Sequence, residues 1–239
     1  MRRFDIPAAP PLAGGRGDLL RLIDPRGRAV AWLDPQAGRC VGYAVRPAGV
    51  TVGGWRELLG GADRHVASDD EAPIGGAIVV GWPWPGEVSP EPPARWRLIE
   101  RDPTAATCAC RCVSVLARER VAALTLGAWL DEGVLRLRLV AQAADATSTL
   151  RPQFRLTVPG LGITIERLAV TDTAQDARAL RRAGVSLRLT AATQPQRHAT
   201  WWVETNAVGT ICTASAAPFG ALAGDEDVCV LAMTVGPLD

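Results

Sequence analysis

Apolar and polar positions alternate with a period of two along much of this 239-residue chain. In the stretch "VLRLRLV", Leu135, Leu137 and Leu139 take alternate positions, and Arg136 and Arg138 stand between them. Successive side chains of a β-strand point to opposite faces of a sheet. The pattern therefore predicts a half-buried strand with one leucine face and one arginine face.

Similar apolar runs, separated by Gly, Pro and Asp turns, predict a chain built mainly of short strands. The spacing of the turns is typical of a β-sandwich or barrel and differs from that of βαβ units. The predicted strands cover residues 19–24, 29–34, 39–45, 76–82, 95–101, 107–117, 121–130, 134–143, 148–158, 162–172, 185–192, 198–204, 209–216 and 227–235.

A single segment carries a helical signal. The stretch "TAQDARALRRAG" (173–184) has a Thr or Asp start, an Ala/Leu face and a Gly stop, which together predict a short helix. The Pro-rich stretch 85–95 is too short to be a domain linker, so we expect residues 1–239 to form a single domain.

Composition and charge exclude several classes of protein. Hydrophobic residues make up 48% of the chain and charged residues 21%, as in globular proteins. The net charge of +1 gives no global electrostatic case for nucleic acid or an anionic membrane, so we expect neither partner. Because no apolar run has the length of a signal peptide core or a membrane span, we expect a cytoplasmic protein with reduced thiols.

The polar motifs do not indicate a metal centre or a common catalytic motif. Cys108, Cys110 and Cys112 alternate along a predicted strand, which spreads the thiols too far apart for one metal ion. We interpret them as core residues and expect no metal or other cofactor. The two histidines, His65 and His198, lie outside any recognised catalytic motif.

The tryptophans are a candidate feature for binding. The chain has eight Trp, against one Tyr and three Phe. In "GWPWPG", Trp82 and Trp84 alternate with prolines that fix the backbone between them. The two indoles either pack the end of a strand or form the rim of a binding site, since the apolar faces of sugar rings stack on indoles.

A second candidate is the polar face of three predicted strands. If those strands share a sheet, its outer face carries several guanidinium groups and an amide. Such a face either covers a solvated sheet or binds sugars, sugar phosphates or acidic glycans. The residues concerned are Arg136, Arg138, Arg151, Gln153, Arg155 and Arg188.

Four segments in a characteristic order resemble the galactose mutarotase-like superfamily, which includes aldose 1-epimerases and hexose-6-phosphate mutarotases. They are an opening hairpin (19–45), a Gly-Gly-hydrophobic segment ending in "WPWPG" (74–87), a pair of central strands followed by "RPQF" (124–162), and the tail (198–235). The resemblance implies a large antiparallel β-sandwich, or supersandwich, with a concave sugar-binding face. It also implies anomer interconversion by a histidine acid and a glutamate base without a metal.

The catalytic positions of the family differ here. The family's His-x-Tyr-Phe reads Arg151-Pro152-Gln153-Phe154, and its Cys-x-Glu reads Cys212-Thr213-Ala214. A guanidinium, with a pKa above about 12, is no proton donor near neutral pH, and alanine is no base. The resemblance therefore implies a degenerate mutarotase homologue.

We accordingly predict a carbohydrate-binding, aldose 1-epimerase-like protein that has lost its isomerase chemistry. Its ligand is expected to be a monosaccharide, a sugar phosphate or an acidic glycan. The expected binding residues are Trp82, Trp84, Arg138, Arg151 and Gln153.

Two alternatives remain open. The chain is an active aldose 1-epimerase if other groups, such as Glu204 or His65, supply the acid and the base. It is a structural or interaction sandwich if neither the aromatic turn nor the arginine face binds a ligand.

Overall fold

The computed structural model describes thirteen ranges of the chain, and every regular element within them is a β-strand. The predicted all-β, antiparallel fold is therefore confirmed. The described residues are 19–47, 49–50, 53–60, 77–81, 96–113, 121–143, 152–159, 163–170, 175–182, 185–194, 199–205, 209–216 and 228–238.

The first of two sheets, called sheet A, contains eight of the described strands in antiparallel pairing. Their order is β1-β2-β3-β5-β10-β15-β14, and β4 also pairs with β3. The strands are β1 (Leu20–Ile23), β2 (Ala29–Asp34), β3 (Arg39–Val45), β4 (Arg56–Gly60), β5 (Ala77–Gly81), β10 (Gln153–Pro159), β14 (Thr200–Thr205) and β15 (Gly209–Ser215).

The second sheet, called sheet B, also contains eight described strands in antiparallel pairing. Their order is β11-β12-β13-β16-β9-β8-β7-β6. The strands are β6 (Arg97–Arg101), β7 (Ala105–Val113), β8 (Val121–Asp131), β9 (Val134–Ala143), β11 (Thr164–Leu168), β12 (Gln175–Arg182), β13 (Val185–Gln194) and β16 (Val228–Pro237).

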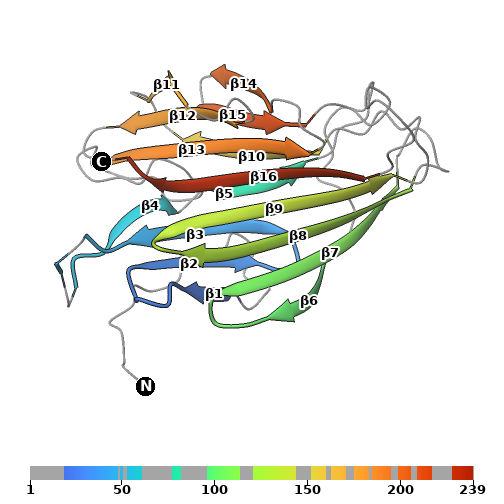
Figure 1. Ribbon diagram of the computed structural model, residues 1–239, viewed down its shortest axis with the longest axis horizontal. Coiled ribbons are helices and arrows are strands. Elements are labelled where there is room, and N and C mark those ends of the chain that lie inside the picture. Colours follow the sequence, from blue (N-terminus) through green and yellow to red (C-terminus); the bar gives the residue numbers. More distant parts are fainter. Residues whose placement is uncertain are drawn as a thin grey trace.

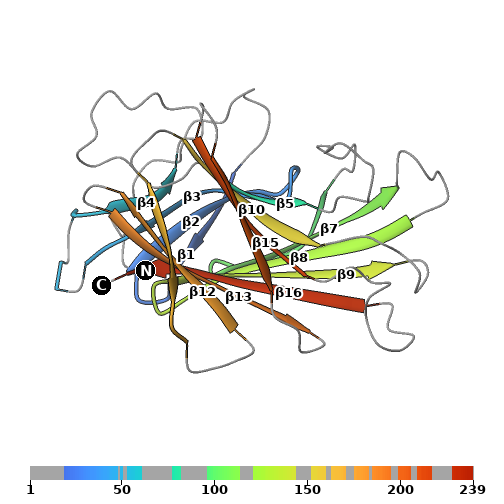
Figure 2. The same cartoon turned by 90° about the horizontal axis from the view of Figure 1, so that it is seen from above.

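The two sheets lie face to face, as Figures 1 and 2 show, and the core fills the space between them. Leu22 and Phe154 of sheet A and Leu139 and Leu231 of sheet B are almost completely buried in one apolar cluster. On each strand, core residues such as these alternate with residues that point outward, which is the pattern expected when the inner faces of two sheets pack in a sandwich. The period of two seen in the sequence thus decides which side chains enter the core.

The sequence pattern located most strands, but it did not show which strands share a sheet. Strand β4 was not predicted at all. Strands β9 and β13 belong to sheet B, whereas β10 belongs to sheet A. A single sheet carrying Arg138, Gln153 and Arg188 on one face therefore does not exist.

The predicted helix over 173–184 is wrong, because Gln175–Arg182 forms strand β12 between β11 and β13. In the strand, Leu180 enters the core and Asp176 and Arg178 point to the same inner side. Arg178 Nη1 lies 2.6 Å from Asp176 Oδ1, and its guanidinium stacks on Trp201 of sheet A at 5.6 Å. The pairing of β12 with β11 and β13, together with the contact to Trp201, outweighs the local helix propensity of alanine, leucine and arginine.

A set of hydrogen bonds ties one end of sheet A to one end of sheet B. The turn between β8 and β9 is Glu132-Gly133, and both residues have positive φ, as in a two-residue type I′ hairpin. Tyr43 of β3 donates a hydrogen bond from its hydroxyl to the Gly133 carbonyl, and the Gly133 N–H donates to the Asp24 carboxylate at 3.2 Å. Asp24 also accepts from the backbone of Arg26 and Arg28, so a single buried carboxylate organises two turns from different sheets.

Removing the Tyr43 hydroxyl should lower the free energy of unfolding by about 1–2 kcal/mol at neutral pH, because the Gly133 carbonyl loses a partly buried donor. The test is urea denaturation of Tyr43→Phe. Asp24→Asn is the companion variant, since it weakens the second bond to the same residue. A double mutant whose loss is less than the sum of the single losses would show that the bonds act together. A loss below about 0.3 kcal/mol in Tyr43→Phe would show that the hydrogen bond from Tyr43 to Gly133 does not contribute to the free energy of unfolding.

Buried thiols should make the fold sensitive to alkali. Burial raises the pKa of Cys40 and of Cys212 from 9.0 to about 12, and burial also raises the pKa of Tyr43. The folded protein therefore keeps these protons after the unfolded chain has released them. The stabilisation is complete below pH 9 and is lost as the pH rises towards 12, by at most about 1.4 kcal/mol per pH unit for each thiol.

Urea denaturation at intervals between pH 8 and pH 10.5 should show this decline. Cys40→Ala and Cys212→Ala should each make the slope shallower, although each also lowers the stability at pH 8 by leaving a small cavity. An unchanged slope in the double variant would contradict the assignment to the thiols.

Candidate functional site

All four resembling segments contribute strands to sheet A, and three of them supply the consecutive strands β5, β10 and β15. Strand β5 lies within the Gly-Gly-hydrophobic segment, directly after its two glycines. Strand β10 contains the end of "RPQF", and β15 contains "CTAS". These strands are neighbours, and Gln153 of β10 pairs with Gly81 on one side and with Ser215 on the other. Because Phe154 and Ala214 enter the core, the alternate residues Gln153 and Ser215 point to the outer side of sheet A.

This outer row of sheet A is polar and largely shielded. It is defined here as Gln153, Arg155, Thr213 and Ser215, where Arg155 pairs with Thr213 across the strands. Gln153 is 8% exposed and Thr213 is 9% exposed. No hydrogen bond joins the Gln153 amide to another described residue, whereas the Ser215 hydroxyl donates to the Ala216 carbonyl at 2.9 Å. The row offers an amide and hydroxyl groups, which both donate and accept hydrogen bonds.

The position that resembles the family's glutamate supplies no base. Ala214 is completely buried and its methyl group belongs to the core. Glu204, considered above as a substitute, lies exposed on β14 and aligns through Ile211 with position 157 of β10. That position is four residues beyond Gln153, or about 13 Å along the strand, and β14 lies two strands from β10, about 10 Å across. Glu204 is therefore remote from Gln153.

The other half of sheet A carries apolar residues on its outer side. Val30, Trp32, Val41 and Ala44 form a small buried cluster there, with Trp55 packed against it. The guanidinium of Arg46 lies 4.4 Å from the Trp55 ring centroid. Some of the eight tryptophans therefore have a packing role, since Trp32 is only 2% exposed.

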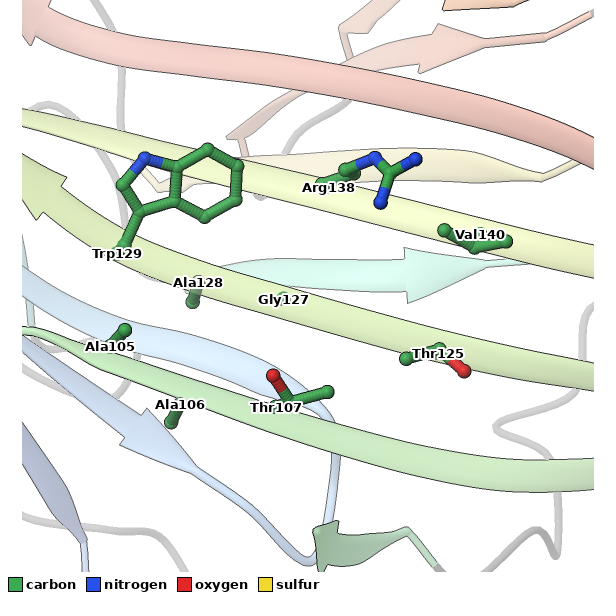
Figure 3. Close-up of a pocket in the computed structure, with 9 residues that line it drawn as sticks. All are labelled: Ala105, Ala106, Thr107, Thr125, Gly127, Ala128, Trp129, Arg138 and Val140. Carbon is green, nitrogen blue, oxygen red and sulfur yellow. The ribbon is translucent and has the colours of Figure 1, made fainter. Parts of the chain in front are cut away.

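Sheet B carries a hollow of about 300 Å³ on its outer side (Figure 3). It spans β7, β8 and β9 and contains a predicted binding residue, Arg138. Figure 3 shows the indole of Trp129 and the guanidinium of Arg138 on the same side of the sheet, with Gly127 between them. The other residues that line the hollow are three alanines, two threonines and a valine: Ala105, Ala106, Ala128, Thr107, Thr125 and Val140.

The strand register explains why a hollow forms at this point. Gly127 pairs with Thr107 of β7 and with Arg138 of β9, so it stands in the middle of a row. It has no side chain to cover the sheet, and the nearest atom to a Cβ built there is Cζ3 of Trp129, at 3.7 Å. The missing side chain leaves a gap bounded by an indole, a guanidinium and a hydroxyl.

The charges around the hollow are unequal. Arg136 Nη2 lies 3.3 Å from Asp131 Oδ2, so that cation is paired with a carboxylate. For Arg138, by contrast, the described part of the chain provides no ion pair or hydrogen bond, and its side chain is exposed. Within the described part of the chain, the positive charge at the edge of the hollow is therefore not paired with a carboxylate.

The two predicted binding residues that the structure describes are not brought to one place. Gln153 faces outward from sheet A, while Arg138 faces outward from sheet B, because Leu137 and Leu139 occupy the core. The two residues lie on opposite sides of the sandwich and cannot contact the same monosaccharide. Trp82, Trp84, Arg151, His65 and His198 lie outside the described residues.

Trp129 and Gly127 were missed as site residues, although the sequence contained a signal for them. In "LTLGAWL", Thr125, Gly127 and Trp129 alternate with the core residues Leu124, Leu126 and Ala128. The sequence therefore indicated that these three residues share one face of the strand. It did not indicate that this face lies beside Arg138, because that depends on the pairing of β8 with β9.

The described residues contain no group of three or more His, Cys, Asp or Glu side chains arranged to hold a metal ion. Cys40, Cys212 and Cys229 are buried, unpaired thiols. Cys108, Cys110 and Cys112 belong to β7, but their side chains lie outside what the structure describes. The described residues form no helix long and apolar enough to cross a membrane.

Comparison with protein-family models finds no match, and neither does comparison with curated protein sequences. Solved structures do match. A galactose mutarotase-like protein from Lactobacillus casei superposes with a TM-score of 0.58 at 10% identity, covering 92% of this chain and 99% of its own.

Two further structures agree. An aldose epimerase homologue from C. elegans gives a TM-score of 0.54 at 8% identity, covering 94% of this chain and 100% of its own. A galactose mutarotase related enzyme from Lactobacillus acidophilus gives 0.54 at 7% identity, covering 93% and 98%. The two packed antiparallel sheets of this chain therefore have the galactose mutarotase-like fold, as the resemblance implied.

Proposed function

We propose that the chain is a carbohydrate-binding, mutarotase-like protein that no longer interconverts anomers. The observation that carries the proposal is the meeting of β5, β10 and β15 in sheet A. These strands bring together three segments that resemble the mutarotase-like group and are separated by more than 30 residues in sequence. The fold match supports a sugar as the ligand, since the matched structures are described as mutarotase-like or epimerase-like proteins.

The outer row of sheet A suits the neutral part of a sugar. Gln153 has amide donors and an acceptor, and Thr213 has a hydroxyl, which together complement the hydroxyl groups of a pyranose. Both side chains are more than nine-tenths buried. In such a shielded place a missing hydrogen bond costs more than it does in water, so the row should discriminate between ligands.

Three predicted contacts extend this proposal. In the sequence, Trp82 is the next residue after Gly81, and Arg151 precedes Gln153 by two positions, while Gly81 and Gln153 pair in sheet A. Trp84 follows two positions after Trp82. We assign the indoles to the sugar's C–H face and the guanidinium to a hydroxyl or an acidic group.

The loss of chemistry follows from the identity of the groups present. Anomer exchange needs a group that takes a proton from the anomeric hydroxyl and another that protonates the ring oxygen. Arg151 stays protonated at neutral pH, Ala214 has no titratable group, and Glu204 is remote from Gln153. The row binds, in this proposal, without transferring protons.

The protein should not accelerate mutarotation. Exchange between the α and β anomers of glucose, galactose and glucose 6-phosphate, measured by NMR, should proceed at the buffer rate with protein present. An active aldose 1-epimerase measured in the same buffer verifies the assay. Acceleration proportional to protein concentration would overturn the loss of chemistry and favour the alternative of an active epimerase.

Neutral sugars should bind through Gln153. Ligand-observed NMR and calorimetry with glucose and galactose should show an affinity that Gln153→Ala lowers about tenfold, because the amide hydrogen bonds are lost. Gln194→Ala is the matched control, since Gln194 is exposed at the end of β13 in the other sheet. Equal affinity in the Gln153 variant would remove this row from the site, and silence of the wild type to all sugars would favour an interaction sandwich.

A further inference from the structure

We propose that the hollow on the outer side of sheet B is a separate binding site for an anionic monosaccharide. Arg138 would hold the carboxylate or phosphate, and Trp129 would stack on the ring. The site lies on the face opposite the Gln153 row, so it goes beyond the proposed function and does not depend on it. The argument rests on a cation that has no ion-pair partner among the described residues, on an indole and on a gap in the sheet, which the strand register places together.

The anion is indicated by the state of Arg138. Its neighbour on the same face, Arg136, is neutralised by Asp131, which is therefore not available to Arg138. A guanidinium presents parallel N–H groups that match the two oxygens of a carboxylate or a phosphate. Such a bond is charge-assisted, and the described residues provide no competing carboxylate for it.

The ring is indicated by Trp129 and Gly127. The indole is only partly buried, it lines the hollow, and no guanidinium of the described residues stacks on it. Gly127 leaves the space beside the indole unfilled. The apolar C–H face of a pyranose can enter this space and stack on the indole.

The size and the rim of the hollow restrict the ligand. A volume of about 300 Å³ is at the lower end for small-molecule sites, which suits a single ring better than an extended chain. Thr107 lies on one side of Gly127 and Thr125 lies two residues away on the same strand face. Their hydroxyl groups are therefore placed to meet the hydroxyls of the ring.

The alternative is that Arg138 and Trp129 are solvated surface residues, which would not bind acidic sugars selectively. Calorimetry at low ionic strength should distinguish the two cases with four probes: glucuronate, glucose 6-phosphate, inorganic phosphate and glucose. The proposal expects one or both acidic sugars to bind at least tenfold more tightly than phosphate alone or glucose alone. Whether glucuronate or glucose 6-phosphate binds more tightly identifies whether the site prefers a carboxylate or a phosphate. No binding of either acidic sugar would overturn the proposal.

Arginine variants locate the binding. Arg138→Gln should lower the affinity for the acidic sugar at least tenfold, the loss expected for a charge-assisted hydrogen bond. Arg188→Gln is the matched control, because Arg188 is exposed on the outer face of the same sheet and the change in net charge is identical. Equal losses in the two variants would indicate general electrostatic attraction and would overturn the site.

A steric pair tests the gap itself. Gly127→Val should abolish binding by filling the space beside Trp129, and valine is well accepted in a strand. Ala123→Val is the control, since Ala123 is exposed on the same face of β8, four residues away. Circular dichroism would verify that both variants fold. Undiminished binding in folded Gly127→Val would overturn the placement of the ring.

The result is separable from the proposed function. Gln153→Ala should leave the affinity for the acidic sugar at sheet B unchanged, while Arg138→Gln should leave neutral sugar binding at sheet A unchanged. If Gln153→Ala removed acidic sugar binding and Arg138→Gln did not, the hollow would be excluded and the row of sheet A would remain.

Discussion

The strand register between β8, β9 and β16 decides the direction of every side chain on sheet B. Leu135, Leu137 and Leu139 fill the core only when Arg136 and Arg138 point outward. A shift by one residue would exchange the two sets and place two guanidinium groups between the sheets, which is far more costly than any surface contact is favourable. Both outer faces of the molecule are therefore consequences of the way in which its core is packed.

The sequence could predict what depends on local periodicity and could not predict what depends on distant pairing. Strand β9 was located from its leucine–arginine alternation alone, and the antiparallel sandwich followed from many such strands. The placement of Gln153 and Arg138 on opposite faces depends on β10 pairing with β5 and β15, which are far away in the chain. Strand β12 was mistaken for a helix because Asp176 and Arg178 on its inner side interrupt the apolar alternation. The tryptophan that contacts Arg178, Trp201, belongs to the other sheet and could not be identified from the sequence.

The same separation explains how a fold can persist while its sequence changes. Identity to the matched structures is 7–10%, yet the superposition covers more than nine-tenths of each chain. Core positions need only be apolar and of suitable volume, a requirement that many sequences meet. Outward positions such as Gln153 and Gly127 contribute little to the core, so they are free to change with the ligand.

The hydrogen bonds of Gly133 have a consequence for binding thermodynamics. Gly133 lies in the turn that joins β8 and β9, the two strands that carry Trp129, Gly127 and Arg138. Because Tyr43 and Asp24 anchor this turn to the opposite sheet, the backbone frame of the hollow is preorganised before any ligand arrives. At the proposed site, the conformational entropy that the protein itself loses on binding would then be mainly that of the Arg138 side chain.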